Sequence, residues 1–327
     1  MVFVNILILV AGFAVLIKGA DFFVDGSVSL AKIFRVPSLI IGLTIVALGT
    51  SLPELSVSTV AALRGSNEIA LSNVVGSNIC NLLMVLGVCA VMRPIPVEAS
   101  VLKRDFPVGL VPTVILFFLV GGTGLFDGSL FRQEMSAISG TVTRPVAACL
   151  LALFILYLVF LVFSARKHPE PEDDEKPKYT GGKCALVMII GVAMIIGGGE
   201  AVVYSAQEIA RSLGLSETLI GLTVVALGTS LPELVTSLVA AKKGELELAV
   251  GNAVGSNIFN LLMILGTSAL IHPVTVNFAS VWDMLILIAV TGMTWIFAST
   301  GKRRITRGEG VTMTLAYIAV IVFAIVR

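Results

Sequence analysis

Charged residues are scarce in this sequence. Asp, Glu, Lys and Arg together make up 13% of its 327 residues, about half the share that soluble domains carry. Hydrophobic residues make up 57%, and the mean hydropathy is +1.01. This composition excludes an ordinary soluble domain and is typical of a protein that lies in a lipid bilayer. The net charge of +1 gives no electrostatic attraction to nucleic acid.

Cysteine is also rare, with four residues in the chain, and none has CxxC or Cys/His spacing. The cysteines are therefore expected to be small buried side chains rather than metal ligands. The chain has no GxGxxG, Walker or DKTG-type signature, so we expect neither an enzyme nor a pump driven by ATP. The first apolar run lacks a basic N-terminal region and an A-x-A site, which predicts a first span rather than a removable signal.

Ten segments are apolar enough to cross a bilayer, for which about 20 residues are needed. Their approximate limits are 2–20, 37–63, 69–92, 106–121, 144–165, 184–210, 217–241, 247–271, 279–299 and 309–326. We therefore predict an all-α membrane protein with ten transmembrane helices. The polar stretch 122–143 is expected to be a loop. The charged run RKHPEPEDDEKPKYTGG at 166–182 is read as a solvated linker between residues 1–165 and 183–327, which hold five spans each.

Lysine and arginine are distributed unevenly between alternate loops. One set of loops holds 16 of these residues and the other set, with the C-terminus, holds five, while Lys18 lies in the first span. The richer side of a membrane protein faces the cytoplasm. Both termini are therefore expected outside and the linker inside. Since no organelle signal is visible, a prokaryotic cytoplasmic membrane is the expected location.

The decapeptide VALGTSLPEL occurs at 46–55 and, unchanged, at 225–234. The same offset of 179 residues aligns NVVGSNICNLLMVLG at 73–87 with NAVGSNIFNLLMILG at 252–266. Five spans separate the copies, so the second copy enters the membrane from the opposite side, as in the inverted repeats of many secondary transporters. Duplication kept for packing alone is the alternative. Packing, however, does not require ten identical residues that include Thr, Ser and Glu.

Each decapeptide is expected to break its helix, in spans 2 and 7. Pro53 has no N–H and leaves the carbonyl of Gly49 without a donor, and a freed carbonyl at membrane depth needs a partner such as a cation. The side chains offered here are the hydroxyls of Thr50, Ser51, Thr229 and Ser230 and the carboxylates of Glu54 and Glu233. An oxygen-only set favours Ca²⁺ or Na⁺ over Zn²⁺ or Cu²⁺. Two carboxylates would balance the charge of one Ca²⁺.

The second repeated motif adds polar groups at helical spacing. Ser77 and Asn81 are four residues apart and share one helix face, as do Ser256 and Asn260. An amide at the depth of a span needs an internal partner, and a glutamate or a cation would serve. For the asparagine of GSN itself, helix packing is an equally good explanation.

The glutamates of the decapeptides have no evident counter-ion. A carboxylate at the middle of a bilayer costs about 2.5–3.5 kcal/mol on insertion scales, and no Lys or Arg lies at the depth of Glu54 or Glu233. A mobile cation or a proton is the expected partner. Asp21 and Glu200, which align in the repeat, are expected to be interfacial or capping carboxylates near the ends of their spans. An acidic ion vestibule is the alternative.

GTSLPE followed by GSNxxN, present in both halves, resembles the paired α-repeats of the cation/Ca²⁺ antiporter superfamily, above all the prokaryotic Na⁺/Ca²⁺ exchangers. The resemblance covers nearly the whole chain. It implies ten helices in an inverted five-plus-five repeat and Na⁺-driven Ca²⁺ movement by alternating access. The ligands that it implies are Glu54, Glu233, Thr50, Ser51, Thr229, Ser230, Ser77, Ser256, Asn81, Asn260 and the carbonyls of Ala47 and Ala226. Some members of the family have Asp at the position of Asn260, so this site holds two carboxylates where theirs holds three.

The sequence thus predicts an antiporter with Ca²⁺ and Na⁺ as transported ions and with no cofactor. A Ca²⁺/H⁺ or other divalent-cation exchanger on the same scaffold is the first alternative, because glutamates in a low dielectric can carry protons. A passive channel is less favoured, since channels usually form rings of subunits, and a sensor that binds Ca²⁺ without transport is a third alternative. The bilayer is the expected partner, with no obligatory protein partner, and we expect a monomer. Spans 1 and 6 are the expected moving bundle.

Overall fold

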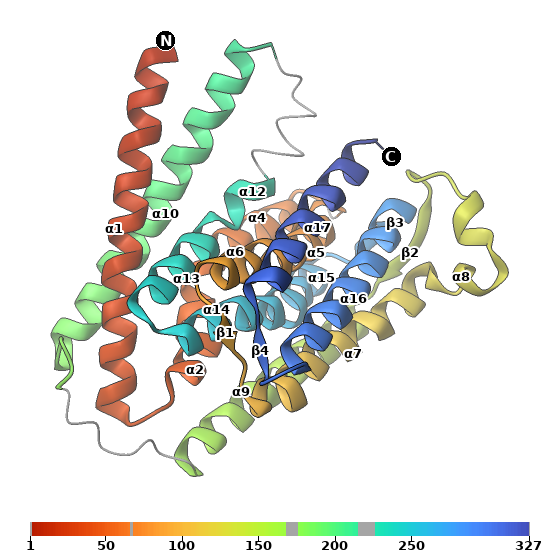
Figure 1. The fold of residues 1–327 in the computed structure, drawn as a ribbon. Helices are drawn as coiled ribbons and strands as arrows, with labels where there is room; N and C mark the ends of the chain where they lie inside the picture. Colours follow the sequence, from red (N-terminus) through yellow and green to blue (C-terminus); the bar gives the residue numbers. More distant parts are fainter. Residues whose placement is uncertain (1, 66–67, 168–175, 215–225, 327) are drawn as a thin grey trace.

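The computed structural model describes residues 2–65, 68–167, 176–214 and 226–326 (Figure 1). The chain is mostly helical, and η denotes short π- or 3-10-helical segments. The first half contains α1 Val2–Phe34, α2 Ser38–Ile41, η1 Gly42–Val46, α3 Ala47–Thr50, α4 Leu52–Leu63, α5 Glu68–Cys80, η2 Asn81–Val85, α6 Leu86–Met92, β1 Ile95–Pro96, η3 Val101–Asp105, α7 Phe106–Phe117, η4 Phe118–Gly122, α8 Gly124–Asp127, η5 Ser129–Arg132, β2 Ile138–Val142 and α9 Arg144–Lys167. The second half contains α10 Gly181–Ser212, α12 Ala226–Thr229, α13 Leu231–Lys243, α14 Leu246–Ile258, η7 Phe259–Ile264, α15 Leu265–Ile271, β3 Val274–Asn277, α16 Phe278–Ser299, β4 Arg304–Ile305 and α17 Arg307–Val326.

Eight helices of the described chain are long and apolar enough to cross a membrane. The bent pair Ser38–Thr50 and Leu52–Leu63 makes a ninth candidate span. The predicted span at 217–241 begins outside the described residues, and its described part is α12 and α13. A membrane protein is therefore the observed architecture, while the count of ten spans stays a prediction.

The predicted end of the first span, at residue 20, is wrong. α1 continues to Phe34 and is 33 residues long, which corresponds to about 50 Å at 1.5 Å per residue. The helix continues through Asp21 and Asp25 because lysines pair with both carboxylates. Asp21 is therefore an ion-paired residue inside α1, not a capping residue near its end.

The stretch 122–143, expected to be a loop, contains α8, η5 and β2. β2 pairs antiparallel with β3, with Val142 opposite Val274, and β1 pairs antiparallel with β4. Thr141, Val142 and Val274 are β-branched residues, which suit a strand. The prediction of an all-α fold is thus corrected by two small two-stranded sheets in a mostly helical protein.

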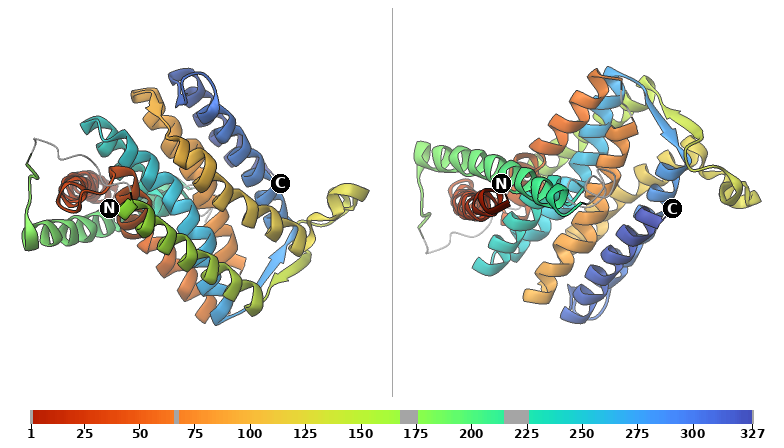
Figure 2. Two further views of the ribbon diagram at one scale, coloured as in Figure 1. Left: turned by 90° about the horizontal axis from the view of Figure 1, so that it is seen from below. Right: turned by 90° about the horizontal axis from the view of Figure 1, so that it is seen from above.

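α1 and α10 lie side by side and antiparallel at one edge of the molecule (Figure 1), and Figure 2 shows the pair to one side of the other helices. Glycines bring their backbones together. A Cβ added at Gly198 would lie 2.6 Å from the backbone nitrogen of Leu16 and 2.9 Å from the carbonyl oxygen of Gly12. A Cβ at Gly19 would lie 2.8 Å from the carbonyl oxygen of Gly191. The two contacts are equivalent, since the repeat aligns Gly12 with Gly191 and Gly19 with Gly198.

Buried hydrophobic side chains form two clusters. The smaller cluster joins α1 and α10 to parts of α2, η1, α13 and α14, and Leu16, Phe23 and Ile195 belong to it. The larger cluster holds the core of the other helices, from Leu39 to Tyr317. The α1–α10 pair therefore packs on the rest of the protein through an apolar surface of its own.

Replacing Gly198 by Val is expected to force α1 away from α10, because the new side chain meets the backbone of Leu16. Overpacking of this kind costs about 1–3 kcal/mol, so the variant should melt at a lower temperature than the wild type in detergent. Gly197→Val is the matched control, since nothing lies within 4 Å of a Cβ at that position. Equal melting temperatures for the two variants would contradict the close helix contact.

Candidate cation site

Ser51 lies at a break between two helices in the first decapeptide. α3 and α4 meet here, and the half-helices Ser38–Thr50 and Leu52–Leu63 form an angle of 50°. Ser51 has φ −85° and ψ 8°, and Pro53 lies in the first turn of α4, where its missing N–H costs little. Ser230 stands between α12 and α13 with nearly the same angles, φ −89° and ψ 3°. Each break therefore starts a new helix directly before a glutamate.

Glu54 lies in the first turn of α4 and Glu233 in the first turn of α13, and both side chains are fully buried. The two carboxylates lie near each other, because Ser51, which lies one turn before Glu54, donates to Glu233. No lysine or arginine of the described chain forms an ion pair with either one. The Oε2 atom of each glutamate also finds no hydrogen-bond partner there. Two buried carboxyl groups thus share the interior, with one oxygen of each available to a ligand.

Serine hydroxyls hold the other carboxylate oxygens. Ser77 donates to Oε1 of Glu54 at 3.4 Å, and Ser256 donates to Oε1 of Glu233 at 3.4 Å. Ser51 donates across the repeats to Oε1 of Glu233 at 2.9 Å. The structure therefore brings together predicted ligands from both decapeptides and from both GSN motifs.

Asn81 and Asn260 are buried in matching π-helical segments, η2 and η7. Such widened turns occur often at functional sites. Neither polar atom of the Asn81 side chain has a hydrogen-bond partner in the described chain. Asn260 donates to Oδ1 of Asn78 at 3.0 Å and leaves its own Oδ1 without a partner. Both amides offer a buried oxygen to a cation.

At the first break, Thr50 and Ala47 both have hydrogen-bond partners. Thr50 donates to Oδ1 of Asn252, in the other repeat, at 3.0 Å. The carbonyl of Ala47 accepts the N–H of Ser51 at 3.0 Å, so one of its lone pairs remains for a ligand.

The second break lacks the equivalent contacts. Among the described residues, Ser230 makes no bond with Glu54, and Thr229 makes none with Asn73. Thr229 lines a cavity of about 310 Å³ between α4 and α10. Ala226 is the first residue of α12, directly after the undescribed segment. Identical sequences therefore have different surroundings in the two halves.

Sequence reasoning missed a pair of asparagines behind the carboxylates. Asn73 donates to the carbonyl of Glu54 at 3.3 Å and to the hydroxyl of Ser58 at 3.0 Å. Its counterpart Asn252 donates to the carbonyl of Glu233 at 3.3 Å. The repeat contained the signal, because both asparagines lie four residues before the GSN serines and therefore on the same helix face.

Asn78 and Asn257 join the two repeats. The amide of Asn78 donates to the carbonyl of Asn257 at 3.2 Å, and the amide of Asn257 donates to the carbonyl of Asn78 at 3.1 Å. A reciprocal pair is the contact pattern of a two-fold arrangement. These residues therefore hold α5 against α14 beside the carboxylates.

Within the described residues, no group of three or more His, Cys, Asp or Glu side chains is placed to hold a metal ion. The site depends on two carboxylates together with hydroxyl, amide and carbonyl oxygens. Ca²⁺ and Na⁺ accept such oxygen ligands, whereas Zn²⁺ and Cu²⁺ prefer sites with His or Cys.

Comparison with known proteins agrees with this site. The sequence matches the family described as sodium/calcium exchanger protein over residues 4–163 and 183–326. The chain belongs to the sodium/calcium exchanger family. The sodium/calcium exchanger MaX1 of Methanosarcina acetivorans is 33% identical, over 98% of this chain and 99% of the relative. The inner membrane protein YrbG of Escherichia coli is 36% identical, over 95% and 94%.

The fold of this exchanger-family chain is also that of a solved relative. The structure of the sodium-calcium exchanger NCX_Mj matches with a TM-score of 0.81 and 30% identity, over 98% of this chain and 99% of the other. The family assignment read from the doubled motif is confirmed. The family consists of membrane transporters rather than enzymes.

Asn252→Ala is expected to destabilise the exchanger-family chain more than Asn73→Ala. Both variants lose an amide that donates to a glutamate carbonyl, but only Asn252 also accepts the hydroxyl of Thr50. Without Asn252 the Thr50 hydroxyl has only the backbone carbonyls of Val46 and Ala47, at 3.2 and 3.4 Å. A hydrogen bond contributes about 0.5–1.5 kcal/mol, so the Asn252 variant should have the lower melting temperature in detergent. Equal shifts in the two variants would contradict the asymmetry between the halves.

Proposed function

We propose that this chain is a secondary antiporter that exchanges Na⁺ for Ca²⁺ at a central site containing Glu54 and Glu233. The observation that carries this proposal is a pair of buried carboxylates with no basic partner in the described chain and an unbonded Oε2 on each. One Ca²⁺ would balance both charges, and Na⁺ ions would do so together. The names of MaX1 and NCX_Mj as sodium/calcium exchangers support this choice of ions.

The site residues would have three roles. The carboxylates of Glu54 and Glu233 would bind the cation directly, and the serines that donate to their Oε1 atoms would orient them. Buried oxygens without a partner would complete the coordination. The additional ligands that we propose are Thr50, Ser51, Thr229, Ser230, Ser77, Ser256, Asn81, Asn260 and the carbonyls of Ala47 and Ala226.

Exchange would proceed by alternating access in a ten-span inverted repeat with spans 2 and 7 broken. The α1–α10 pair is the proposed moving unit, because it packs on the other helices through a separate apolar cluster. A cation at the site would neutralise the carboxylates and permit the movement, whereas two bare charges would oppose it. The excess of Lys and Arg supports an orientation with the linker in the cytoplasm and both termini outside, and the proposed location is a prokaryotic inner membrane. A monomer without cofactor would suffice.

Ca²⁺ uptake by proteoliposomes tests the coupling. Vesicles loaded with Na⁺ and diluted into Na⁺-free buffer should take up Ca²⁺, and vesicles with equal Na⁺ on both sides should not. Uptake that ignores the Na⁺ gradient but follows a proton gradient would replace the proposal by Ca²⁺/H⁺ exchange.

Glu54→Gln and Glu233→Gln should each reduce Na⁺-driven Ca²⁺ uptake to the level of protein-free vesicles. Glutamine keeps the side-chain shape and removes a buried carboxylate that has no basic partner in the described chain, so neither variant should melt at a lower temperature than the wild type. Glu208→Gln is the matched control, since this partly exposed residue of α10 pairs with Arg211 away from the site. Normal uptake by a site variant would remove that glutamate from the proposed mechanism.

A further inference from the structure

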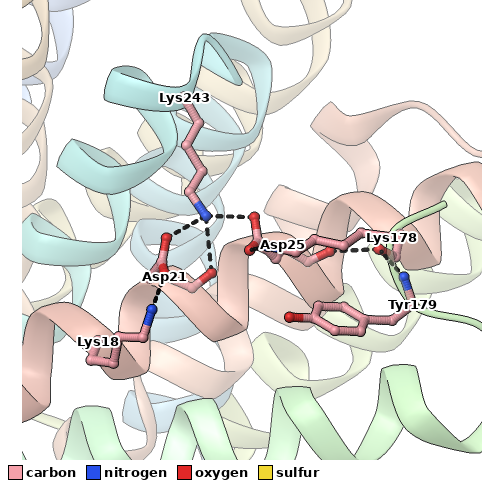
Figure 3. A network of polar contacts seen from close by, with 7 residues as sticks. Lys18, Asp21, Asp25, Lys178, Tyr179 and Lys243 are labelled. Carbon is pink, nitrogen blue, oxygen red and sulfur yellow. Dashed lines mark hydrogen bonds and ion pairs between the residues drawn. The ribbon is translucent and has the colours of Figure 1, made fainter. Parts of the chain in front are cut away.

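Lys243, the last residue of α13, joins this helix to α1 by two ion pairs (Figure 3). Its Nζ lies 2.5 Å from Asp21 and 2.5 Å from Asp25. Lys18 also pairs with Asp21, at 2.7 Å, and Lys178 of the linker pairs with Asp25, at 2.5 Å. The network therefore ties α1, α13 and the linker together at the end of the molecule where α10 begins, which we call the linker face.

The repeat places an equivalent pair of residues toward the opposite face. The offset of 179 residues aligns Asp21 with Glu200 of α10, and Arg64 with Lys243. Arg64 follows α4 directly, as Lys243 ends α13. Each of these basic residues precedes a glycine with a positive φ, 74° in the first half and 91° in the second. Glu200 and Arg64 are thus the repeat counterparts of Asp21 and Lys243.

This second pair is open in the structure. Neither Glu200 nor Arg64 forms an ion pair with any described residue. Glu200 lines the 310 Å³ cavity between α10 and α4, and the same cavity reaches Thr229 at the second break. α1 packs along α13, but α10 makes no comparable contact with α4 in the described chain. α1 and α13 therefore meet at the linker face, whereas their counterparts α10 and α4 are separated toward the opposite face.

The hydrogen bonds around the carboxylates show the same difference between the halves. Ser51 and Thr50 reach across to the second repeat, at 2.9 Å and 3.0 Å, and their counterparts beside the cavity do not reach back. A polar cavity of about 240 Å³ does adjoin the ion pairs at the linker face, where Lys32, Lys178 and Lys243 line it. No predicted cation ligand lines that cavity. Of these two cavities, only the one toward the opposite face therefore reaches a predicted ligand, Thr229.

We propose that Asp21, Asp25 and Lys243 form a latch that closes the linker face, and that Glu200 and Arg64 form the counterpart latch that closes the opposite face in the alternative state. This inference rests on the proposed alternating access. Movement of the α1–α10 pair would separate Asp21 from Lys243 while it brings Glu200 to Arg64. The linker-face latch has more ion pairs, so it favours the state seen here. Partly exposed ion pairs shift an equilibrium only about two- to fivefold each, which leaves both latches able to open.

Thiol labelling tests the first latch without any ion flux. Cys149 is the exposed cysteine of the chain and is replaced by Ser, and Val203→Cys then places a thiol in the wall of the open cavity. Lys243→Gln should slow the labelling of this thiol by a membrane-impermeant reagent, by about two- to fivefold, because the cavity closes in the alternative state. Lys242→Gln removes the same charge one residue away and should leave the rate unchanged. Equal rates in the two variants would overturn the latch.

Two further variants give results that a merely structural role would not produce. Arg64→Gln should leave the labelling rate equal to that of the parent or raise it, opposite in sign to Lys243→Gln, and slower labelling would count against the counterpart latch. Lys243→Arg keeps the positive charge beside Asp21 and Asp25 and should retain the parent rate, and slower labelling in a protein that melts normally would also count against the ion pairs.

Disulfide formation tests the second latch directly. The double variant Arg64→Cys with Glu200→Cys should cross-link under a mild oxidant when Na⁺ and Ca²⁺ are present. Without these ions the same variant, in which Lys243 is intact, should cross-link much more slowly. Absence of any cross-link during active exchange would overturn this part of the inference. The labelling needs no gradient, so its failure is distinct from a failure of the proposed function, which would appear as missing Na⁺-driven Ca²⁺ uptake in the wild type.

Discussion

Glu54 and Glu233 lie fully buried among apolar helices, and no basic residue of the described chain neutralises them. An ionised group in such a place costs several kcal/mol unless charge and hydrogen bonds compensate for it. The local structure meets part of this requirement. Each break puts a glutamate in the first turn of a helix, where the helix dipole favours a negative charge. Serine hydroxyls occupy one oxygen of each carboxylate, and the other oxygen of each has no hydrogen-bond partner in the described chain.

The duplicated sequence provides every group twice, yet the two copies are not in the same state. Asn78 and Asn257 exchange equivalent hydrogen bonds, and the glycines of α1 and α10 make equivalent close contacts at two points. Ser51, by contrast, reaches the opposite glutamate and Ser230 does not. A symmetric arrangement would leave the site equally open or equally closed to both faces. The proposed alternating access needs one face closed at a time, so under that proposal the departures from symmetry indicate which face is open.

Most of the architecture could be predicted from residue patterns. The apolar runs, the charged linker and the break at Pro53 all depend on local chemistry, and the structure has a bend of 50° where the decapeptide predicts one. The length of α1 could not be predicted, because Asp21 and Asp25 interrupt the apolar run in the sequence. The helix continues through them because lysines from distant positions pair with their carboxylates. β2 was missed for a similar reason, since a two-stranded sheet needs its partner β3, which lies far along the chain.

The sequence by itself determines the family, the duplicated motif and the two carboxylates, because these depend on which residues are present and at what spacing. The roles of Asn73 and Asn252 could be assigned only from the tertiary structure. The spacing of an asparagine predicts the helix face on which its side chain lies, but not the atom with which that side chain forms a hydrogen bond. The same holds for the choice between the two faces. Asp21 and Glu200 occupy equivalent positions, but one is bound by Lys243 and the other lines a cavity. Two identical decapeptides have the same local preferences, so only tertiary packing, such as that of α1 against α13, distinguishes the two halves.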